Sequence, residues 1–189
     1  MDRYHIALFI HLVTLVVASA ATAVTKIAVG RRARARTIAD VIDWHDVLMS
    51  ASKLFPICLA LFVITGSYML SLTDSHAWSS GFIVAGLVGA TLLLASGVFL
   101  GIKGRALKHV LDEMAKGGMD KPAPKLVPPP LIAALPAINT GIALAVVFDM
   151  VTKPASVPVA LAIVAVGIAL GAASGMRRPA AAAERATAA

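Results

Sequence analysis

Uncharged apolar segments dominate the pattern of hydrophobic and polar positions along this chain. Five segments contain no Asp, Glu, Lys or Arg, and each is 20 to 28 residues long: residues 4–25, 54–73, 75–102, 126–148 and 154–176. A helix needs about 20 apolar residues to cross a bilayer. The pattern predicts an all-α membrane protein, a five-helix transmembrane bundle with spans at about residues 4–29, 54–72, 80–102, 131–151 and 156–176.

Little of the 189-residue chain is left over for a soluble domain. We expect residues 1–178 to form a single transmembrane domain and the Ala-rich residues 179–189 to form a flexible tail. Between the first two spans, residues 38–50 alternate acidic and apolar positions, which predicts a short amphipathic helix at the membrane surface. Apolar residues at helical spacing continue after the third span as far as Met114, so this helix should extend past the membrane.

The positive charge of the chain indicates topology. The net charge is +7 and the pI is about 10.0, which taken alone would suggest a nucleic-acid partner. However, all Lys and Arg except Arg3 and Lys153 lie in residues 26–53, in residues 103–125 or after residue 176. Because short loops rich in Lys and Arg stay in the cytoplasm, we expect the N-terminus outside and the C-terminus in the cytoplasm. The partner of this charge is the lipid bilayer, and no nucleic acid is expected.

The first span has one alternative interpretation. Ala18, Ser19 and Ala20 resemble a signal-peptidase site that follows an apolar run. The segment before the run has little net positive charge, whereas a basic cluster follows at residues 31–36. That arrangement favours a retained helix, so we expect the first span to stay uncleaved.

Small residues recur at helical spacing on the last span. Gly167, Gly171 and Gly175 lie on one face of the predicted helix, where they let another helix approach closely. The other helix belongs either to a second subunit, in a homo-oligomer or with a membrane partner, or to the same chain. We favour packing within the chain. Asn139, near the middle of the fourth span, could line a polar path but is more typical of a hydrogen bond between helices.

An acidic and a basic residue stand at the end of the fourth span. Asp149 and Lys153 are four residues apart, in the order that favours an ion pair at a helix end. A lone acid near a membrane face can also take part in proton transfer. The spacing favours the ion pair, and the second interpretation supports a small-solute or proton permease only weakly.

One histidine is unusual in its position. His11 lies within the apolar part of the first span, on its outer side. Such a residue can hydrogen-bond a neighbouring helix, bind a metal ion or ligate haem through a neutral ring nitrogen. Met69 and Met150 lie at comparable depth and could complete a His/Met ligand set for haem b or copper. His76, in the outer loop, is a further metal candidate. A hydrogen-bonded packing role for His11 carries more weight.

Short motifs carry a resemblance to known families. The segment Phe9-Ile10-His11-Leu12 resembles the first helix of the copper-resistance D-type membrane proteins and of the bacterial membrane protoporphyrinogen oxidase. Over nearly its whole length the chain is similar to an uncharacterised family of bacterial multi-pass integral membrane proteins. This resemblance rests on Phe55-Pro56, on residues 65–69 and 81–87, and on residues 150–154.

The resemblance implies a bacterial cytoplasmic (inner) membrane and gives His11 as a haem or metal ligand. The oxidase has a lysine at the start of its third helix, and residues 81–87 contain none, so oxidase activity is not implied. Taken together, the sequence predicts a non-catalytic membrane subunit or scaffold. The alternative is a membrane protein that binds haem b or copper through His11, and no enzyme activity is assigned.

Overall fold

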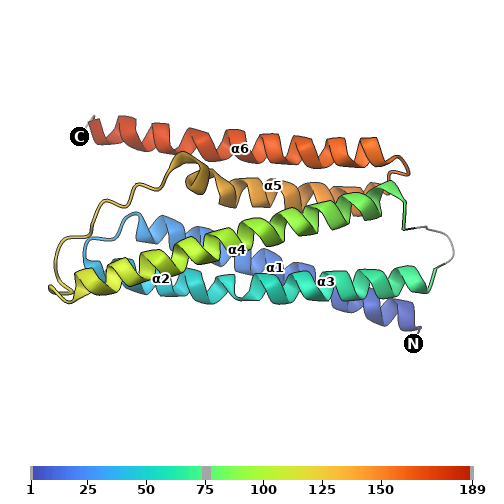
Figure 1. The fold of residues 1–189 in the computed structure, drawn as a ribbon, viewed down its shortest axis with the longest axis horizontal. Helices are drawn as coiled ribbons and strands as arrows, with labels where there is room; N and C mark the ends of the chain where they lie inside the picture. Colours follow the sequence, from blue (N-terminus) through green and yellow to red (C-terminus); the bar gives the residue numbers. More distant parts are fainter. Residues whose placement is uncertain (1, 74–77, 188–189) are drawn as a thin grey trace. The chain divides into compact units, whose positions relative to one another are not determined.

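The chain folds into a succession of long helices. The computed structural model describes residues 2–73 and 78–187, with side chains through residue 176. Its helices are α1 (Arg3–Arg32), α2 (Ile38–Ser52), α3 (Leu54–Ser71), α4 (Gly81–Ala115), α5 (Pro130–Thr152) and α6 (Val157–Thr187) (Figure 1). With α2 and α3 taken as one, five helices are long and apolar enough to cross a membrane. The all-α fold with five spanning helices is therefore confirmed, and the described residues form no strand.

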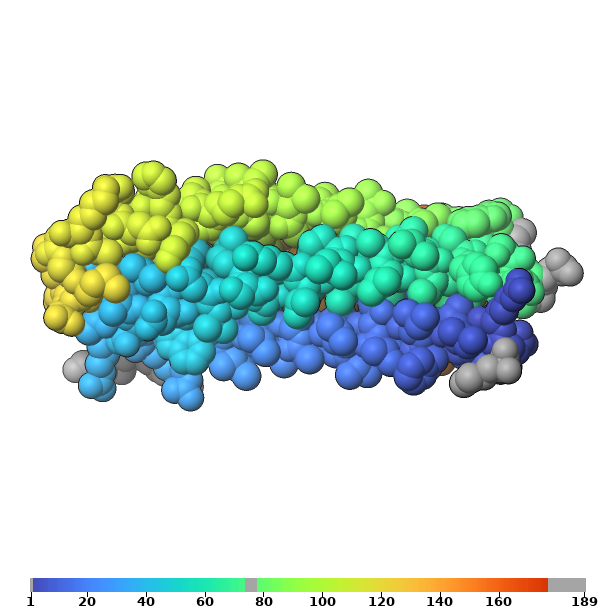
Figure 2. Space-filling view, turned by 90° about the horizontal axis from the view of Figure 1, so that it is seen from below, coloured from blue at the N-terminus to red at the C-terminus, as the bar shows by residue number. Residues whose placement is uncertain are grey.

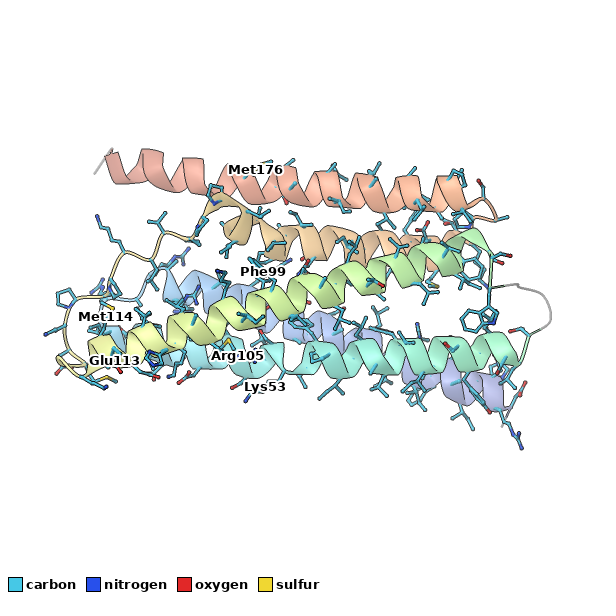
Figure 3. All side chains as sticks on the ribbon, viewed as in Figure 1. Lys53, Phe99, Arg105, Glu113, Met114 and Met176 are labelled. Atoms are coloured by element: carbon cyan, nitrogen blue, oxygen red, sulfur yellow. The ribbon has the colours of Figure 1, made fainter. Side chains whose placement is uncertain are left out.

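Two helices extend beyond the membrane-spanning length. α4 has 35 residues, and Figure 3 shows the apolar Phe99 followed along it by Arg105 and then Glu113, as expected for a helix that leaves the membrane. α6 continues to Thr187, through the segment in which the sequence predicted a flexible tail. That segment is rich in alanine, which has the highest intrinsic helix propensity of all residues.

Backbone contacts group the chain into two compact units. The first contains Met1–Asp74 and Gly97–Leu126, and the second contains Ser75–Ser96 and Val127–Ala189. The two units share α4, whose first half belongs to the second unit and whose second half belongs to the first.

In the first unit, α1 packs against α2 and α3, and Figure 2 shows α1 beside α3. The buried residues of α1 are Ala7, Thr14, Ala21 and Ala28. They are spaced seven apart, close to two helical turns, and therefore lie on one face of the helix. All four side chains are small, which lets neighbouring backbone approach this face closely.

The start of α2 is held by a later part of the chain. Its N-cap Thr37 forms a capping box with Asp40. The next two backbone N–H groups, of Ile38 and Ala39, donate to the carbonyl oxygens of Lys121 and Met119 at 3.0 and 3.1 Å. Helix N-termini leave such donors without a partner inside the helix, so the segment after α4 completes the cap of α2.

The apolar face of α2 is covered by protein. Ile38, Val41 and Ile42 form a buried cluster with Leu111 of α4, and Leu111 is fully buried. The sequence placed this amphipathic face at the membrane surface. The structure instead uses it to join α2 to the part of α4 that extends past the span.

In the second unit, α5 and α6 pack through glycine. A Cβ added to Gly167 would lie 2.5 Å from the carbonyl oxygen of Gly141, and one added to Gly171 would lie 2.6 Å from the carbonyl oxygen of Ala137. Gly175 faces Ala134 in the same way. Because these neighbours are largely backbone atoms, α5 and α6 can approach this closely only with glycine at these positions. We call this contact the seam between α5 and α6.

Candidate functional site

His11 lies on α1 against one face of α3. Its Nδ1 is 2.7 Å from Oγ1 of Thr65. Its ring meets the ring of Phe62 edge-on, with 4.9 Å between the centroids. A Cβ added to Gly66 would lie 3.9 Å from Cε1 of His11, an ordinary van der Waals distance, so the ring also lies beside Gly66. Phe62, Thr65 and Gly66 occupy one turn of α3, and together they fix the position of the ring.

The hydrogen bonds around Thr65 favour one tautomer of His11. Thr65 Oγ1 donates to the carbonyl oxygen of Leu61 at 2.6 Å. A hydroxyl has a single proton to donate, so with that proton on Leu61 it acts as the acceptor toward His11. Nδ1 of His11 therefore carries the hydrogen and donates it to Thr65. The neutral ring then keeps a lone pair on Nε2, for which the described residues provide no hydrogen-bond partner.

The bond to Thr65 is the contact between helices expected of a packing histidine, and it also resembles the way that proteins hold a ligating histidine. A ligating histidine usually donates its second ring nitrogen to an oxygen acceptor, which fixes the tautomer and the orientation of the ring. Thr65 supplies that acceptor here. Sequence reasoning missed Thr65. Its hydroxyl lies in the middle of a charge-free span, and a polar group at that depth indicates a hydrogen-bond partner.

The other ligand candidates are placed as follows. Met69 lies on α3 four residues after Thr65, on the same face and about 6 Å further along the axis. Met150 lies on α5 in the second unit, where its methyl group fills the space left by Gly86 of α4. His76 lies outside the described residues. The described residues contain no group of three or more His, Cys, Asp or Glu that could hold a metal ion.

Asn139 joins two helices of the second unit. Its Oδ1 accepts a hydrogen bond from Oγ of Ser96 on α4 at 2.8 Å. Gly167, Gly171 and Gly175 face α5 of the same chain. The small-residue face that a partner subunit could have used on α6 is thus occupied within the chain.

The predicted ion pair between Asp149 and Lys153 is wrong. Asp149 is fully buried, and neither of its carboxylate oxygens has a hydrogen-bond partner. α5 ends at Thr152, and Lys153 adopts a left-handed backbone conformation with φ 48°. Contact between residues four apart requires both to be helical. Here only the backbone N–H of Lys153 reaches Asp149, by donating to its carbonyl oxygen at 2.8 Å.

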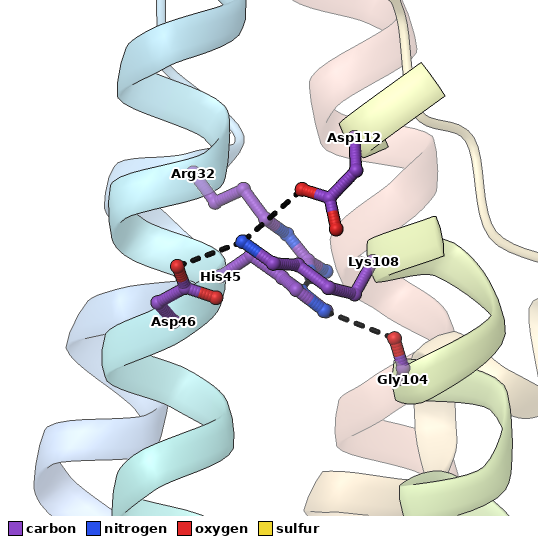
Figure 4. Close-up of polar contacts among 6 residues, drawn as sticks. All are labelled: Arg32, His45, Asp46, Gly104, Lys108 and Asp112. Carbon is purple, nitrogen blue, oxygen red and sulfur yellow. Dashed lines mark hydrogen bonds and ion pairs between the residues drawn. The ribbon is translucent and has the colours of Figure 1, made fainter. Parts of the chain in front are cut away.

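A second histidine, His45, joins α1, α2 and α4 of the first unit near the charged ends of α1 and α4 (Figure 4). His45 of α2 is fully buried. Its Nδ1 accepts from Nη1 of Arg32 at 2.8 Å, and its Nε2 donates to the carbonyl oxygen of Gly104 at 3.0 Å. Lys108 donates to Asp46 at 2.8 Å beside it. The sequence contains one indication that His45 is buried, because it lies on the same face of α2 as the apolar residues Val41 and Ile42.

The surroundings of His45 keep it neutral. It precedes the charge-free segment that begins at Leu54, on a helix that also carries three aspartates. Burial is the main cause that lowers the pKa of His45, and the charge of Arg32 lowers it further, while the hydrogen bond to Gly104 opposes the change. With both ring nitrogens bonded, His45 has a structural role.

Comparison of the chain with known protein families, with curated proteins and with solved structures finds no match.

Proposed function

We propose that the protein is a membrane subunit of the bacterial cytoplasmic membrane that binds haem b through Nε2 of His11. The observation that carries the proposal is the contact of His11 Nδ1 with Thr65 at 2.7 Å, which favours the tautomer that leaves a lone pair on Nε2. The distribution of Lys and Arg supports an outside N-terminus. His11 would then lie toward the outer side of the membrane.

Haem suits this site better than a free metal ion. Haem brings four nitrogen ligands of its own, and a single histidine is enough to hold its iron in globins and peroxidases. A copper ion would need further protein ligands, and Met69 is the nearest sulfur along α3. Copper bound by His11 and Met69 is therefore the second candidate.

The test is the visible absorption spectrum of the full chain, expressed in haem-replete cells and purified in detergent, together with metal analysis. We expect a Soret band that disappears in His11→Ala. His5→Ala is the matched control, because His5 is an exposed histidine on the same helix, and it should keep the band. Thr65→Val removes the acceptor for Nδ1 and should weaken haem binding about 10–100-fold, the usual effect of losing such a partner.

The possible outcomes separate the candidates. Stoichiometric copper without a Soret band, lost in both His11→Ala and Met69→Leu, would replace haem by copper. A colourless, metal-free wild-type protein from haem-replete cells would overturn both and leave a scaffold without a cofactor. Circular dichroism and gel filtration of each variant distinguish loss of the ligand from loss of the fold.

A further inference from the structure

Asp149 is a buried carboxyl that the rest of the structure leaves without a partner. Its side chain is fully buried, and both oxygens lack a hydrogen-bond partner. Among the buried side chains of the described residues, these are the two polar atoms in that condition. Buried polar groups are almost always hydrogen-bonded, so the exception needs a physical explanation.

The side chain points into the second unit. The buried residues of α5 are Ala134, Ile142, Ala145 and Asp149. Their spacings of eight, three and four place them on one face of the helix. Asp149 therefore takes the next position of the core face, one turn beyond Ala145 and one turn before the end of α5.

The environment on that face is apolar. Ala145 packs in a buried cluster with Ala85 of α4 and with Ala160 and Val164 of α6. Beyond this cluster the first turn of α4 is tied to the loop between α5 and α6, where the N–H of Gly81 donates to the carbonyl oxygen of Ala155 at 3.1 Å.

Among the described residues, the helix turns that meet this face carry no ionisable group. The first turns of α4 (residues 81–85) and of α6 (residues 157–160) contain none, and the closest charge along the chain is Lys153. The structure shows no ion pair between Lys153 and Asp149.

An ionised carboxylate is unfavourable in this position. Taking an unpaired ion out of water costs several kcal/mol even after the protein relaxes. Metal cations of the calcium type need six to eight oxygen ligands, and magnesium needs an octahedral set. The described residues offer no such cluster. A proton needs a single oxygen and removes the charge, and the neutral acid is far less costly to bury than the carboxylate.

We propose that the Asp149 carboxyl is a proton-binding site. It takes up one proton from water at the membrane face where α5 ends, an O–H bond forms, and the side chain is held as a neutral acid at neutral pH. Release returns the proton to water and leaves the carboxylate. This site lies in the second unit, and the proposal is independent of any cofactor at His11.

The first test is infrared spectroscopy of the full-length protein in lipid at neutral pH. A neutral carboxyl gives a C=O stretching band that is separate from the bands of carboxylates and shifts in heavy water. We expect one such band, which disappears at alkaline pH and is absent in Asp149→Asn. The control Asp43→Asn changes an exposed carboxyl of α2 and should retain the band.

The second test is chemical. Dicyclohexylcarbodiimide is an apolar reagent that adds to protonated carboxyls, and rearrangement of the first adduct gives a stable acylurea with no group leaving. We expect the label on Asp149, located by mass spectrometry of peptides, with less labelling as the pH is raised. Asp43→Asn should not alter it.

Both tests work on the wild-type protein, so they remain decisive if Asp149→Asn does not fold. A carboxylate at Asp149 at neutral pH, or labelling that sodium ions block at constant pH, would overturn the proposal. The second result would indicate a metal cation in place of the proton.

Discussion

His11 and His45 differ in what their second ring nitrogen meets. In His45 both nitrogens are bonded, to Arg32 and to Gly104, and the ring is fully buried. In His11 only Nδ1 is bonded, to Thr65. The same side chain thus has both ring nitrogens bonded in one place and a single ring nitrogen bonded in the other, among the described residues.

Replacing His45 should destabilise the first unit. His45→Ala leaves the guanidinium of Arg32 and the carbonyl oxygen of Gly104 without their partner, and losing a partner of a buried polar group costs about 1–3 kcal/mol. The measurement is thermal unfolding in detergent. His109→Ala is the control because His109 is exposed on α4, and it should stay within about 0.5 kcal/mol of the wild type. Equal effects of the two variants would contradict the structural role.

The same residue should make stability depend on pH. The folded protein holds the pKa of His45 below its usual value, so below about pH 6.5 the unfolded chain binds a proton that the folded chain does not. Stability is therefore lost as the pH falls. Asp46 and Lys108 also face this cluster, and Arg32 opposes a charge on the ring. Unfolding curves between neutral and mildly acidic pH should show a smaller loss in His45→Ala than in the wild type.

At the level of helices, close approach is concentrated in the seam between α5 and α6. There Gly167 faces the backbone of Gly141 and the methyl group of Ala145. In contrast, a Cβ added to Gly97 of α4 would meet nothing within 4 Å. The two glycines look alike in the sequence, and only their surroundings separate them.

This difference gives a matched pair of substitutions. Gly167→Ala should destabilise the protein by about 1–3 kcal/mol, because the added methyl group forces backbone apart in a packed seam. Gly97→Ala should be neutral or stabilise α4 by up to about 1 kcal/mol, since alanine is the better helix former. Unfolding of both variants in detergent measures the difference. If Gly167→Ala is as stable as the wild type, then α5 and α6 pack less closely than the structure shows.

At the level of the whole molecule, the distribution of charge predicts the orientation in the membrane. The background for the test is Cys58→Ala, which removes the single cysteine. Ala155→Cys, an exposed position in the loop after α5, should react with an impermeant maleimide on intact cells. Met119→Cys, exposed in the loop after α4, should react only after the cells are permeabilised. The reverse pattern would place the N-terminus in the cytoplasm.

The helices themselves could be predicted from the sequence because length and apolar composition are local properties. The contact partners of individual side chains could not be predicted in this way. Thr65 is far from His11 in the sequence, and only the packing of α3 on α1 brings them together. The ion pair at Asp149 failed for a related reason, since the pattern does not show that α5 ends before Lys153. Rows of glycine likewise indicate close packing without naming the helix that packs.

The cap of α2 has a consequence for the order in which the protein is assembled. The N–H groups of Ile38 and Ala39 find their acceptors in Lys121 and Met119, which the ribosome adds only after it has made all of α4. Because the chain is made from its N-terminus, α3 and α4 are synthesised before these acceptors for the start of α2 exist. The start of α2 can therefore reach its full set of hydrogen bonds only after the loop that follows α4 has been made.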